Sequence, residues 1–251
     1  MSILPHIDVV TPATLRPELL KITLASFHKH VLNQFESRRL IINIDAIGDP
    51  HASIEQMLEV CHMYFDDCLY RHAEHPSFAR AVRWGWEQVE ADYFLHLEDD
   101  WLLKKKVDAH SALACFARDP KLALLSLNMG RNRQDLSLTQ FSLRPGFMRR
   151  SFIREALLLF DEHLDPEKQF NPHCFMGGEL AKWHFRYYGE PDDGRFLVDT
   201  GGKWRKSLGF DKWQGAELTW SPSRRHVGMW RDFYLRQKYR LYLRLWNYLA
   251  R

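Results

Sequence analysis

The chain has 251 residues, and 45% of them are hydrophobic, so it can bury a sizeable core as one large domain or two small ones. Its 35 basic and 32 acidic residues leave a formal net charge of only +3, which argues against a chain that binds polyanions over its whole surface. The beginning of the chain has no signal-peptide pattern, and no apolar run reaches the roughly 18 residues that would span a bilayer. We therefore expect a soluble, cytoplasmic protein. No CxxC pair or zinc-ribbon spacing is present, so we expect free thiols at Cys61, Cys68, Cys115 and Cys174.

Short apolar strands alternate with amphipathic helices in the first hundred residues. Strands are predicted at residues 7–10, 40–44 and 93–97, where short apolar runs end in polar loops. A helix opens at Pro17, a second is predicted at residues 53–61 behind a Ser53 and Gln56 capping box, and a third at residues 77–90. Strands that alternate with helices in this way indicate a parallel, doubly wound α/β sheet.

Polar residues follow all three predicted strands. Thr11, Asp45 and the triplet Glu98-Asp99-Asp100 stand at their carboxyl ends, which is where ligands bind in doubly wound sheets. In an extended backbone Glu98 and Asp100 project to one side, while Asp99 points away. Two carboxylates placed in this way suit Mg²⁺ or Mn²⁺, usually shared with a phosphate. A solvated acidic turn is the alternative for an isolated acid triplet.

The second half of the sequence is less regular. A strand is predicted at residues 122–127 and a helix at residues 147–160, with Arg149 and Arg150 near the start of that helix. These two arginines oppose the helix dipole, so we expect them to have an anionic partner or to face solvent. A turn-rich stretch then leads to a predicted helix at residues 180–187. A strand at residues 196–198 ends in a polar segment.

From Arg224 onwards the chain is predicted to form one long helix. Its apolar stripe recurs at spacings of four and three and comprises Leu235, Tyr239, Tyr242, Trp246 and Leu249, and a basic row away from it comprises Arg236, Arg240 and Arg244. Three interpretations stay open. The helix packs on the domain, lies on an anionic membrane surface, or forms a nucleic-acid groove together with residues 131–154.

Four of these features, taken in order, resemble a nucleotide-sugar glycosyltransferase with the GT-A fold, close to the large family 2 type. They are the first strand running into Thr11-Pro12-Ala13-Thr14-Leu15-Arg16, the second strand ending in Asp45, the helix bearing Phe78-Ala79-Arg80-Ala81, and the strand ending in Leu97-Glu98-Asp99-Asp100. The resemblance covers the first hundred residues well. It implies a mostly parallel, doubly wound sheet in a domain at residues 1–223, followed by a basic, aromatic C-terminal helix at residues 224–251. Within the domain, residues 1–105 would form the nucleotide-binding half and residues 106–223 the acceptor and catalytic half.

The resemblance also implies roles for individual residues of the first half. The base and ribose of the nucleotide would lie among Thr11, Pro12, Thr14, Arg16 and Asp45. Glu98-Asp99-Asp100 would be the DxD-like motif, with Asp100 as the metal ligand and Asp99 or Glu98 assisting. The first acid is Glu where the family motif has Asp, which puts direct coordination by Glu98 in doubt.

In the second half, Gly177-Gly178-Glu179 resembles the acidic element that supplies the catalytic base in inverting members, so Glu179 and Asp100 would be the catalytic residues. An ordinary acid at a helix N-terminus is the alternative for Glu179. Asp199 resembles a late metal or phosphate contact, although many relatives have His there. Lys203 and Arg205 would contact the pyrophosphate. Trp204 and Trp213 are candidates for stacking on a sugar or base.

The implied activity is transfer of a hexosyl group, with inversion, from a nucleoside-diphosphate sugar to an acceptor hydroxyl, and a UDP-sugar is favoured. Mn²⁺ or Mg²⁺ would stabilise charge on the leaving diphosphate, and a carboxylate would take the acceptor's proton. The acceptor stays open between a glycan, a lipid-linked sugar and a hydroxymethylated pyrimidine flipped out of DNA, as in phage enzymes that this chain also resembles. The rivals are a nucleotidyltransferase, whose glycine-rich phosphate loop is missing from Thr11 to Arg16, and a non-enzymatic nucleic-acid-binding module.

Overall fold

The fold is taken from a computed structural model. The structure describes residues 3–127, 136–138, 140–170, 180–190, 193–208, 210–212, 220–222 and 229–250. Between residues 206 and 236 it describes the backbone of these segments and, of the side chains, only that of Tyr234.

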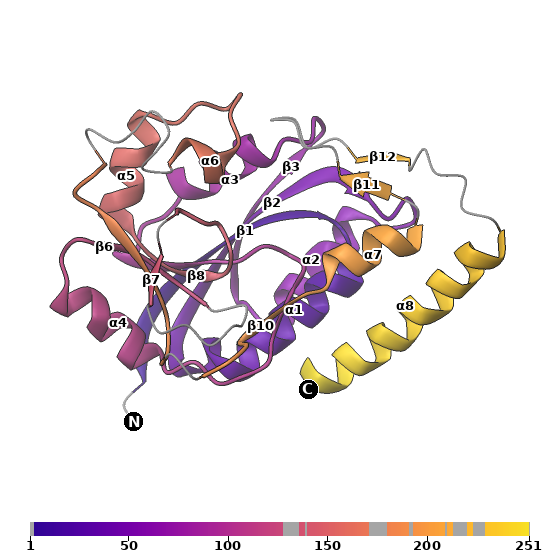
Figure 1. The fold of residues 1–251 in the computed structure, drawn as a ribbon, viewed down its shortest axis with the longest axis horizontal. Coiled ribbons are helices and arrows are strands. Elements are labelled where there is room, and N and C mark those ends of the chain that lie inside the picture. The colour runs from indigo at the N-terminus through magenta and orange to yellow at the C-terminus, as the bar shows by residue number, and fades with distance from the viewer. Residues whose placement is uncertain are drawn as a thin grey trace.

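A central eight-stranded sheet has the strand order β3-β2-β1-β4-β8-β6-β9-β7 (Figure 1). Four neighbouring strands run parallel: β3 (Asp67–Ala73), β2 (Phe35–Gly48), β1 (Leu4–Leu15) and β4 (Tyr93–His96). The other four are β8 (Gly146–Arg149), which is antiparallel to both β4 and β6, then β6 (Leu122–Ser126), β9 (His184–Tyr187) and β7 (Ser137–Leu138). Strands β6 and β9 are parallel, and β7 is antiparallel to β9. The predicted mostly parallel, doubly wound sheet is therefore confirmed.

Two small antiparallel pairs accompany this sheet. The first pairs β5 (Trp101–Leu103) with β10 (Leu197–Asp199), and the second pairs β11 (Phe210–Lys212) with β12 (Trp220–Pro222). Because β5 follows directly after the acid triplet, its pairing with β10 brings the late part of the chain back to Glu98-Asp99-Asp100.

Helices cover both faces of the central sheet. They are α1 (Pro17–His30), α2 (Ile54–His62) and α4 (Ala109–Arg118) on one face, and α3 (Phe78–Glu87), α5 (Arg150–Leu158) and the short α6 (Pro166–Gln169) on the other. A single 3-10 turn, Leu32–Gln34, follows α1. A third core cluster joins the outer side of α1 to α7 (Gly201–Leu208) and α8 (Met229–Ala250). None of the described helices is both long enough and apolar enough to cross a membrane.

Local sequence signals account for the first three helices. Pro17 stands in the first turn of α1, and Ser53 and Gln56 form the predicted capping box at α2. Ser77 caps α3 by accepting a hydrogen bond from the Arg80 backbone N–H. Gly85 lets α3 approach β1 closely, since a Cβ there would lie 2.5 Å from Cγ1 of Val10.

The predicted helix at residues 147–160 is wrong in its first part. Residues Gly146–Arg149 form β8, where Phe147 packs into the core on one face of the sheet and Met148 into the core on the other. Arg149 hydrogen-bonds to the backbone oxygens of Phe116 and Asp119, where α4 ends, and Arg150 forms an ion pair with Asp92 at 3.2 Å. Arg150 therefore has the anionic partner that was one of the two expectations, whereas Arg149 is held by neutral backbone oxygens.

Three further expectations for the second half need correction. The predicted helix at residues 180–187 is mostly wrong, because residues 184–187 form β9 and bury Phe185 and Tyr187 beside β6. The predicted strand at residues 196–198 is shifted by one residue and pairs with β5 outside the central sheet. The polar segment after it contains helix α7, which the sequence did not indicate.

Helix α8 confirms the predicted C-terminal helix and packs on the domain. Tyr239, Tyr242 and Trp246 face α1 and α7, as expected for the apolar stripe. Leu249 is the exception, because it is 37% exposed and Ala250 is buried in its place. The side chains of Leu235 and Arg236 lie outside the described set. Among the cysteines, Cys61, Cys68 and Cys115 are free thiols as predicted, and Cys174 lies outside the described residues.

Candidate functional site

An open pocket lies at the carboxyl edge of β1, β2 and β4. It is lined by Pro12, Ala13, Thr14, Arg16, Asp45, Ile47, Phe78, Glu98, Asp99, Asp100 and Arg205. Most of these residues lie in the carboxyl-terminal parts of three parallel strands or directly after them, the position at which doubly wound sheets bind ligands. The structure thus brings together seven residues that the sequence nominated for one site: Pro12, Thr14, Arg16, Asp45 and the acid triplet.

Arg16 and Asp99 form a buried ion pair in the wall of this pocket, with side chains that are only 4% and 3% exposed. Arg16 holds Asp99 with two nitrogens: Nε donates to Oδ2 at 3.1 Å, and Nη2 donates to Oδ1. Thr14 adds a backbone N–H donor at 3.1 Å and a hydroxyl donor at 3.3 Å. Both oxygens of Asp99 are therefore used inside the protein. This pairing was not predicted, since the sequence assigned Arg16 to the nucleotide and Asp99 to the DxD-like motif.

The Arg16 guanidinium also lies between Asp100 and Trp204. Its Nη1 is 3.1 Å from Oδ2 of Asp100, and its central carbon is 5.4 Å from the centroid of the Trp204 ring. Burial opposes the charge on Arg16, but the attraction of Asp99 and Asp100 outweighs it and raises the pKa of the guanidinium. Arg16 is consequently a fixed positive charge that orients both carboxylates. Trp204, a sequence candidate for stacking on substrate, is buried against this arginine.

The backbone of Asp100 is fixed by hydrogen bonds, whereas its side chain is partly exposed. Its carbonyl oxygen accepts hydrogen bonds from the Thr200 backbone N–H at 2.9 Å and from the Thr200 hydroxyl at 2.7 Å. Its side chain is 13% exposed, in contrast to that of Asp99. A Cβ on Gly201 would overlap Oδ2 of Asp100, so the carboxylate can occupy this place only because a glycine begins α7.

Glu98 lines the same pocket, and its Oε2 accepts a hydrogen bond from the indole N–H of Trp101 at 2.8 Å. This bond fixes the longer arm of the glutamate beside Asp100. Ile47 and Phe78 add apolar surface to the pocket. The sequence did not nominate Ile47. Phe78 was noted only as part of a helix, although its position directly after the Ser77 cap places it at the carboxyl edge.

Asp45 is a buried carboxyl group that lines the pocket from β2, beside Thr14 of β1. The Asn43 side chain donates to its Oδ1 at 2.8 Å, and the Ser77 backbone N–H donates to its Oδ2 at 3.2 Å. Burial raises the pKa of Asp45 to about 6, and these hydrogen bonds only partly oppose that shift. Thr11 does not line the pocket. It is fully buried in β1 and shares a strand face with Val9 and Ala13, which belong to the core on that face.

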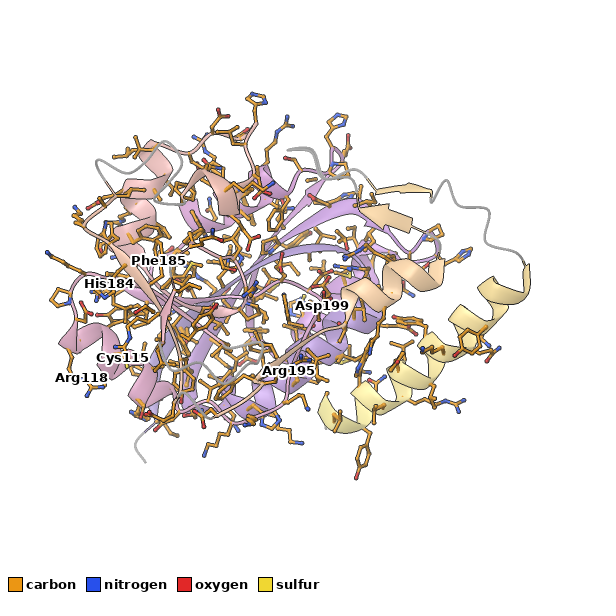
Figure 2. All side chains as sticks on the ribbon, in the orientation of Figure 1. Cys115, Arg118, His184, Phe185, Arg195 and Asp199 are labelled. Atoms are coloured by element: carbon orange, nitrogen blue, oxygen red, sulfur yellow. The ribbon has the colours of Figure 1, made fainter. Side chains whose placement is uncertain are left out.

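Helix α7 supplies one of the three residues predicted from its segment. Arg205 lines the pocket, whereas the Lys203 ammonium lies 3.6 Å from the ring centroid of Tyr242 and 5.4 Å from that of Trp246, both in α8. Asp199 is exposed, and its Oδ1 accepts a hydrogen bond from the Gly202 backbone N–H at 3.0 Å, where it caps α7. Figure 2 shows Asp199 beside the start of this helix. This placement does not support a pyrophosphate contact for Lys203 or a metal contact for Asp199.

Several nominated residues fall outside the described part of the chain. They are Glu179 with its neighbours Gly177 and Gly178, Trp213, and the loop residues Arg131, Arg133 and Asp135. The role of Glu179 therefore stays a prediction.

A divalent metal fits two of the carboxylates. Within the described ranges no group of three or more His, Cys, Asp or Glu side chains is placed to hold a metal. Mg²⁺ commonly binds through one or two carboxylates together with substrate phosphates. Asp100, partly exposed at the pocket wall, and the adjacent Glu98 match that donor set. Asp99 does not match it, because Arg16 and Thr14 occupy both of its oxygens.

Comparisons with known proteins identify the fold. No known family of protein sequences matches the chain, and no curated protein sequence is significantly similar to it. Among solved structures, the 1–349 segment of S. aureus TarS is similar with a TM-score of 0.55 and 13% identity, covering 79% of this chain and 61% of that one. HddC from Yersinia pseudotuberculosis has a TM-score of 0.51 and 11% identity, covering 78% and 94%. A cytidylyltransferase from Leptospira borgpetersenii has a TM-score of 0.50 and 11% identity, covering 82% and 85%.

These neighbours include glycosyltransferases of the GT-A type, and the protein has a GT-A-like fold, as the resemblance implied. The chain spans 36% of the longer TarS chain and 61% of the 1–349 segment. Structural similarity at identities of 11 to 13% shows the fold alone and not the activity or substrates.

Proposed function

We propose that this protein transfers a sugar from a nucleoside-diphosphate sugar to an acceptor hydroxyl, with the donor bound in the carboxyl-edge pocket. One observation carries the proposal. Asp45, Glu98 and Asp100 line a single pocket at the ends of three parallel strands in a GT-A-like fold. A TarS structure in complex with UDP-GlcNAc, which matches this chain with a TM-score of 0.50, supports a nucleotide-sugar donor.

The nucleoside would occupy the part of the pocket at the carboxyl ends of β1 and β2. Pro12 and Thr14 of β1 and Asp45 of β2 line this part, and Ile47 and Phe78 offer apolar surface to a flat base. Asp45 can accept hydrogen bonds from the base or ribose when ionised and donate one when protonated, and its pKa of about 6 puts both forms within reach near neutral pH. A UDP-sugar is the favoured donor.

The diphosphate would lie between the carboxylates and Arg205. When Mn²⁺ or Mg²⁺ is bound, Asp100 and Glu98 would hold it, and it would supply Lewis-acid stabilisation of the leaving diphosphate. Arg16 keeps Asp99 and Asp100 in place from inside the protein. Arg205 adds positive charge at the pocket wall, where the leaving group develops negative charge.

The acceptor hydroxyl must lose its proton as it attacks the anomeric carbon. A carboxylate on the opposite face of the sugar would take that proton, a step typically worth about 10²–10⁴-fold in rate. Glu179 is the residue that we assign to this role, and the outcome would be an inverting hexosyl transfer. The acceptor is a glycan or lipid-linked sugar, or else a hydroxymethylated pyrimidine in DNA, which would have to leave the base stack.

A nucleotidyltransferase is the second candidate, and the similarity to a cytidylyltransferase favours it. Such an enzyme consumes a nucleoside triphosphate and a sugar phosphate, so its substrates differ from those of a glycosyltransferase. The segment from Thr11 to Arg16 contains no glycine to make a phosphate loop. We therefore place the glycosyltransferase first.

Thermal unfolding against a ligand panel tests the donor assignment. UDP, GDP, CMP, UDP-sugars and GDP-sugars are each added with Mn²⁺ and again with EDTA. A donor at about 100 times its dissociation constant should add roughly 2.7 kcal/mol of stability. We expect one nucleotide class to stabilise the wild-type protein only with metal, and Asp100→Asn to abolish that effect. The exposed Asp66→Asn serves as the matched control. Absence of any nucleotide effect at millimolar ligand would refute the proposal.

A further inference from the structure

Helix α8 has a second apolar stripe on the side that faces away from the protein. Its inner side packs against α1 and α7 through Tyr239, Tyr242 and Trp246. The outer stripe consists of Tyr234, Leu241, Leu245 and Tyr248, which are 60%, 68%, 50% and 77% exposed. Spacings of seven, four and three place these four residues on one helix face. Figure 1 shows α8, in yellow, along the outer edge of the molecule.

Positive charge surrounds this outer stripe. The sequence of α8 contains Arg231, Arg236, Lys238, Arg240 and Arg244 against a single acid, Asp232. Of these, Lys238, Arg240 and Arg244 are described and exposed. The helical spacing puts Lys238 on one flank of the stripe and Arg244 on the other. The Lys238 ammonium lies 5.7 Å from the Tyr234 ring, so its stem runs along the stripe.

The packing of α8 holds the stripe in this orientation. Trp246 and Ala250 are buried against the body of the protein, and Lys203 of α7 lies over the rings of Tyr242 and Trp246. The helix therefore cannot roll its outer leucines inward without losing this core. A row of leucines and tyrosines that are at least half exposed marks a contact surface.

We propose that the outer stripe of α8 binds an anionic membrane surface. An interfacial helix presents leucines and aromatic rings to the acyl boundary and basic side chains to the headgroups, as this helix does. Tyrosines stand at both ends of the stripe, where an amphipathic ring suits the boundary between lipid and water. Lysine and arginine stems can lie along the apolar layer while their charges stay at the phosphates.

A nucleic acid fits the same surface less well. Phosphates would pair with Lys238, Arg240 and Arg244, but the groove offers no apolar layer to cover Leu241 and Leu245. The membrane contact stands independently of the proposed function. If the proposed function also holds, α7 connects the two surfaces, because Arg205 lines the pocket while Lys203 contacts α8. An acceptor at the membrane surface would then be the expected class.

Vesicle co-sedimentation tests the proposal with the full-length chain. The probes are phosphatidylcholine vesicles with and without phosphatidylglycerol, at low and at high salt. We expect the wild-type protein to sediment with the anionic vesicles and to be released by salt. The double variant Leu241→Ser/Leu245→Ser should bind about tenfold more weakly or worse, because it removes the apolar contact and leaves the charges.

The control is Ile3→Ser/Leu158→Ser, which removes two apolar side chains that are 68% and 86% exposed, one near the N-terminus and one in α5, both away from α8, and should bind like wild type. Equal binding by the α8 variant and the wild type overturns the proposal, as does a wild-type protein that ignores anionic vesicles or binds duplex DNA instead. Nucleotide-induced thermal stabilisation is measured on the same samples. Its loss with vesicle binding retained would count against the proposed function alone, and the reverse result against the membrane contact alone.

Discussion

Removing the buried guanidinium of Arg16 alone should destabilise the protein far more than removing both charges of the ion pair. Asp99 is 3% exposed and accepts two hydrogen bonds from Arg16. In Arg16→Met its carboxylate would stay buried with only Thr14 as a donor, and breaking a buried pair on one side costs about 3–5 kcal/mol. Arg16→Met/Asp99→Asn leaves no buried charge without a partner at this position. The double variant should therefore recover most of that loss.

Urea unfolding followed by circular dichroism measures these free energies, and unchanged m-values would show that the comparison is between equivalent transitions. The Asp100 carboxylate is partly exposed and can be hydrated in both variants, so it does not mask the recovery. A loss below about 1 kcal/mol in Arg16→Met would be the behaviour of a surface pair. That result, or a double variant no more stable than the single one, would refute our account of the pocket wall.

Three further predictions concern the pocket and its surroundings. The pKa of Asp45 is about 6 in the folded protein, against an ordinary value of 3.8, so the folded state binds this proton more tightly than the unfolded chain does. The free energy of unfolding should therefore fall by about 3 kcal/mol as pH rises from about 4 to 6. Urea unfolding at a series of pH values should show this fall in the wild type and not in Asp45→Asn. The pH dependence due to His96 has the opposite sign, because burial lowers its pKa to about 3 and the unfolded chain binds the proton first. The wild type should therefore lose stability as pH falls from about 6.5 towards 3, and His96→Leu should lose less over the same range. Gly201→Ala should weaken nucleotide binding in calorimetric titrations because its Cβ displaces the Asp100 carboxylate, whereas Gly202→Ala, whose Cβ would meet nothing closer than 3.6 Å, should bind normally.

The pocket at the carboxyl ends of the strands was predictable because the order of strands in the sequence indicates which strand ends lie together in the sheet. Strand ends that are far apart in the chain meet at one edge of a parallel sheet, so Asp45 and the acid triplet could be placed together without a structure. The mutual pairing of Arg16 and Asp99 was not predictable in the same way. It depends on how deeply both side chains are buried, and burial follows from the packing of Trp204 and α7 over them.

Helix α7 is an element that local sequence patterns do not predict. Gly201-Gly202-Lys203 has poor helix propensity and no apolar repeat, and the helix forms because Trp204 packs against α1 and α8. Once the segment is helical, Lys203 and Arg205 point to opposite sides, which explains why only Arg205 reaches the pocket. The strand β9 was missed for a related reason, since His184–Tyr187 is too short for its alternation to be distinguished from a helix.

Turnover of a sugar donor tests the central claim most directly. The wild-type protein is incubated with UDP-sugars and GDP-sugars and Mn²⁺, together with glycan, lipid-linked or hydroxymethylated DNA acceptors, and release of the nucleoside diphosphate is followed. We predict release that one acceptor class accelerates, that Asp100→Asn abolishes and that Asp66→Asn retains. Consumption of a nucleoside triphosphate and a sugar phosphate, with no release from any nucleotide sugar, would contradict the account and establish a nucleotidyltransferase instead.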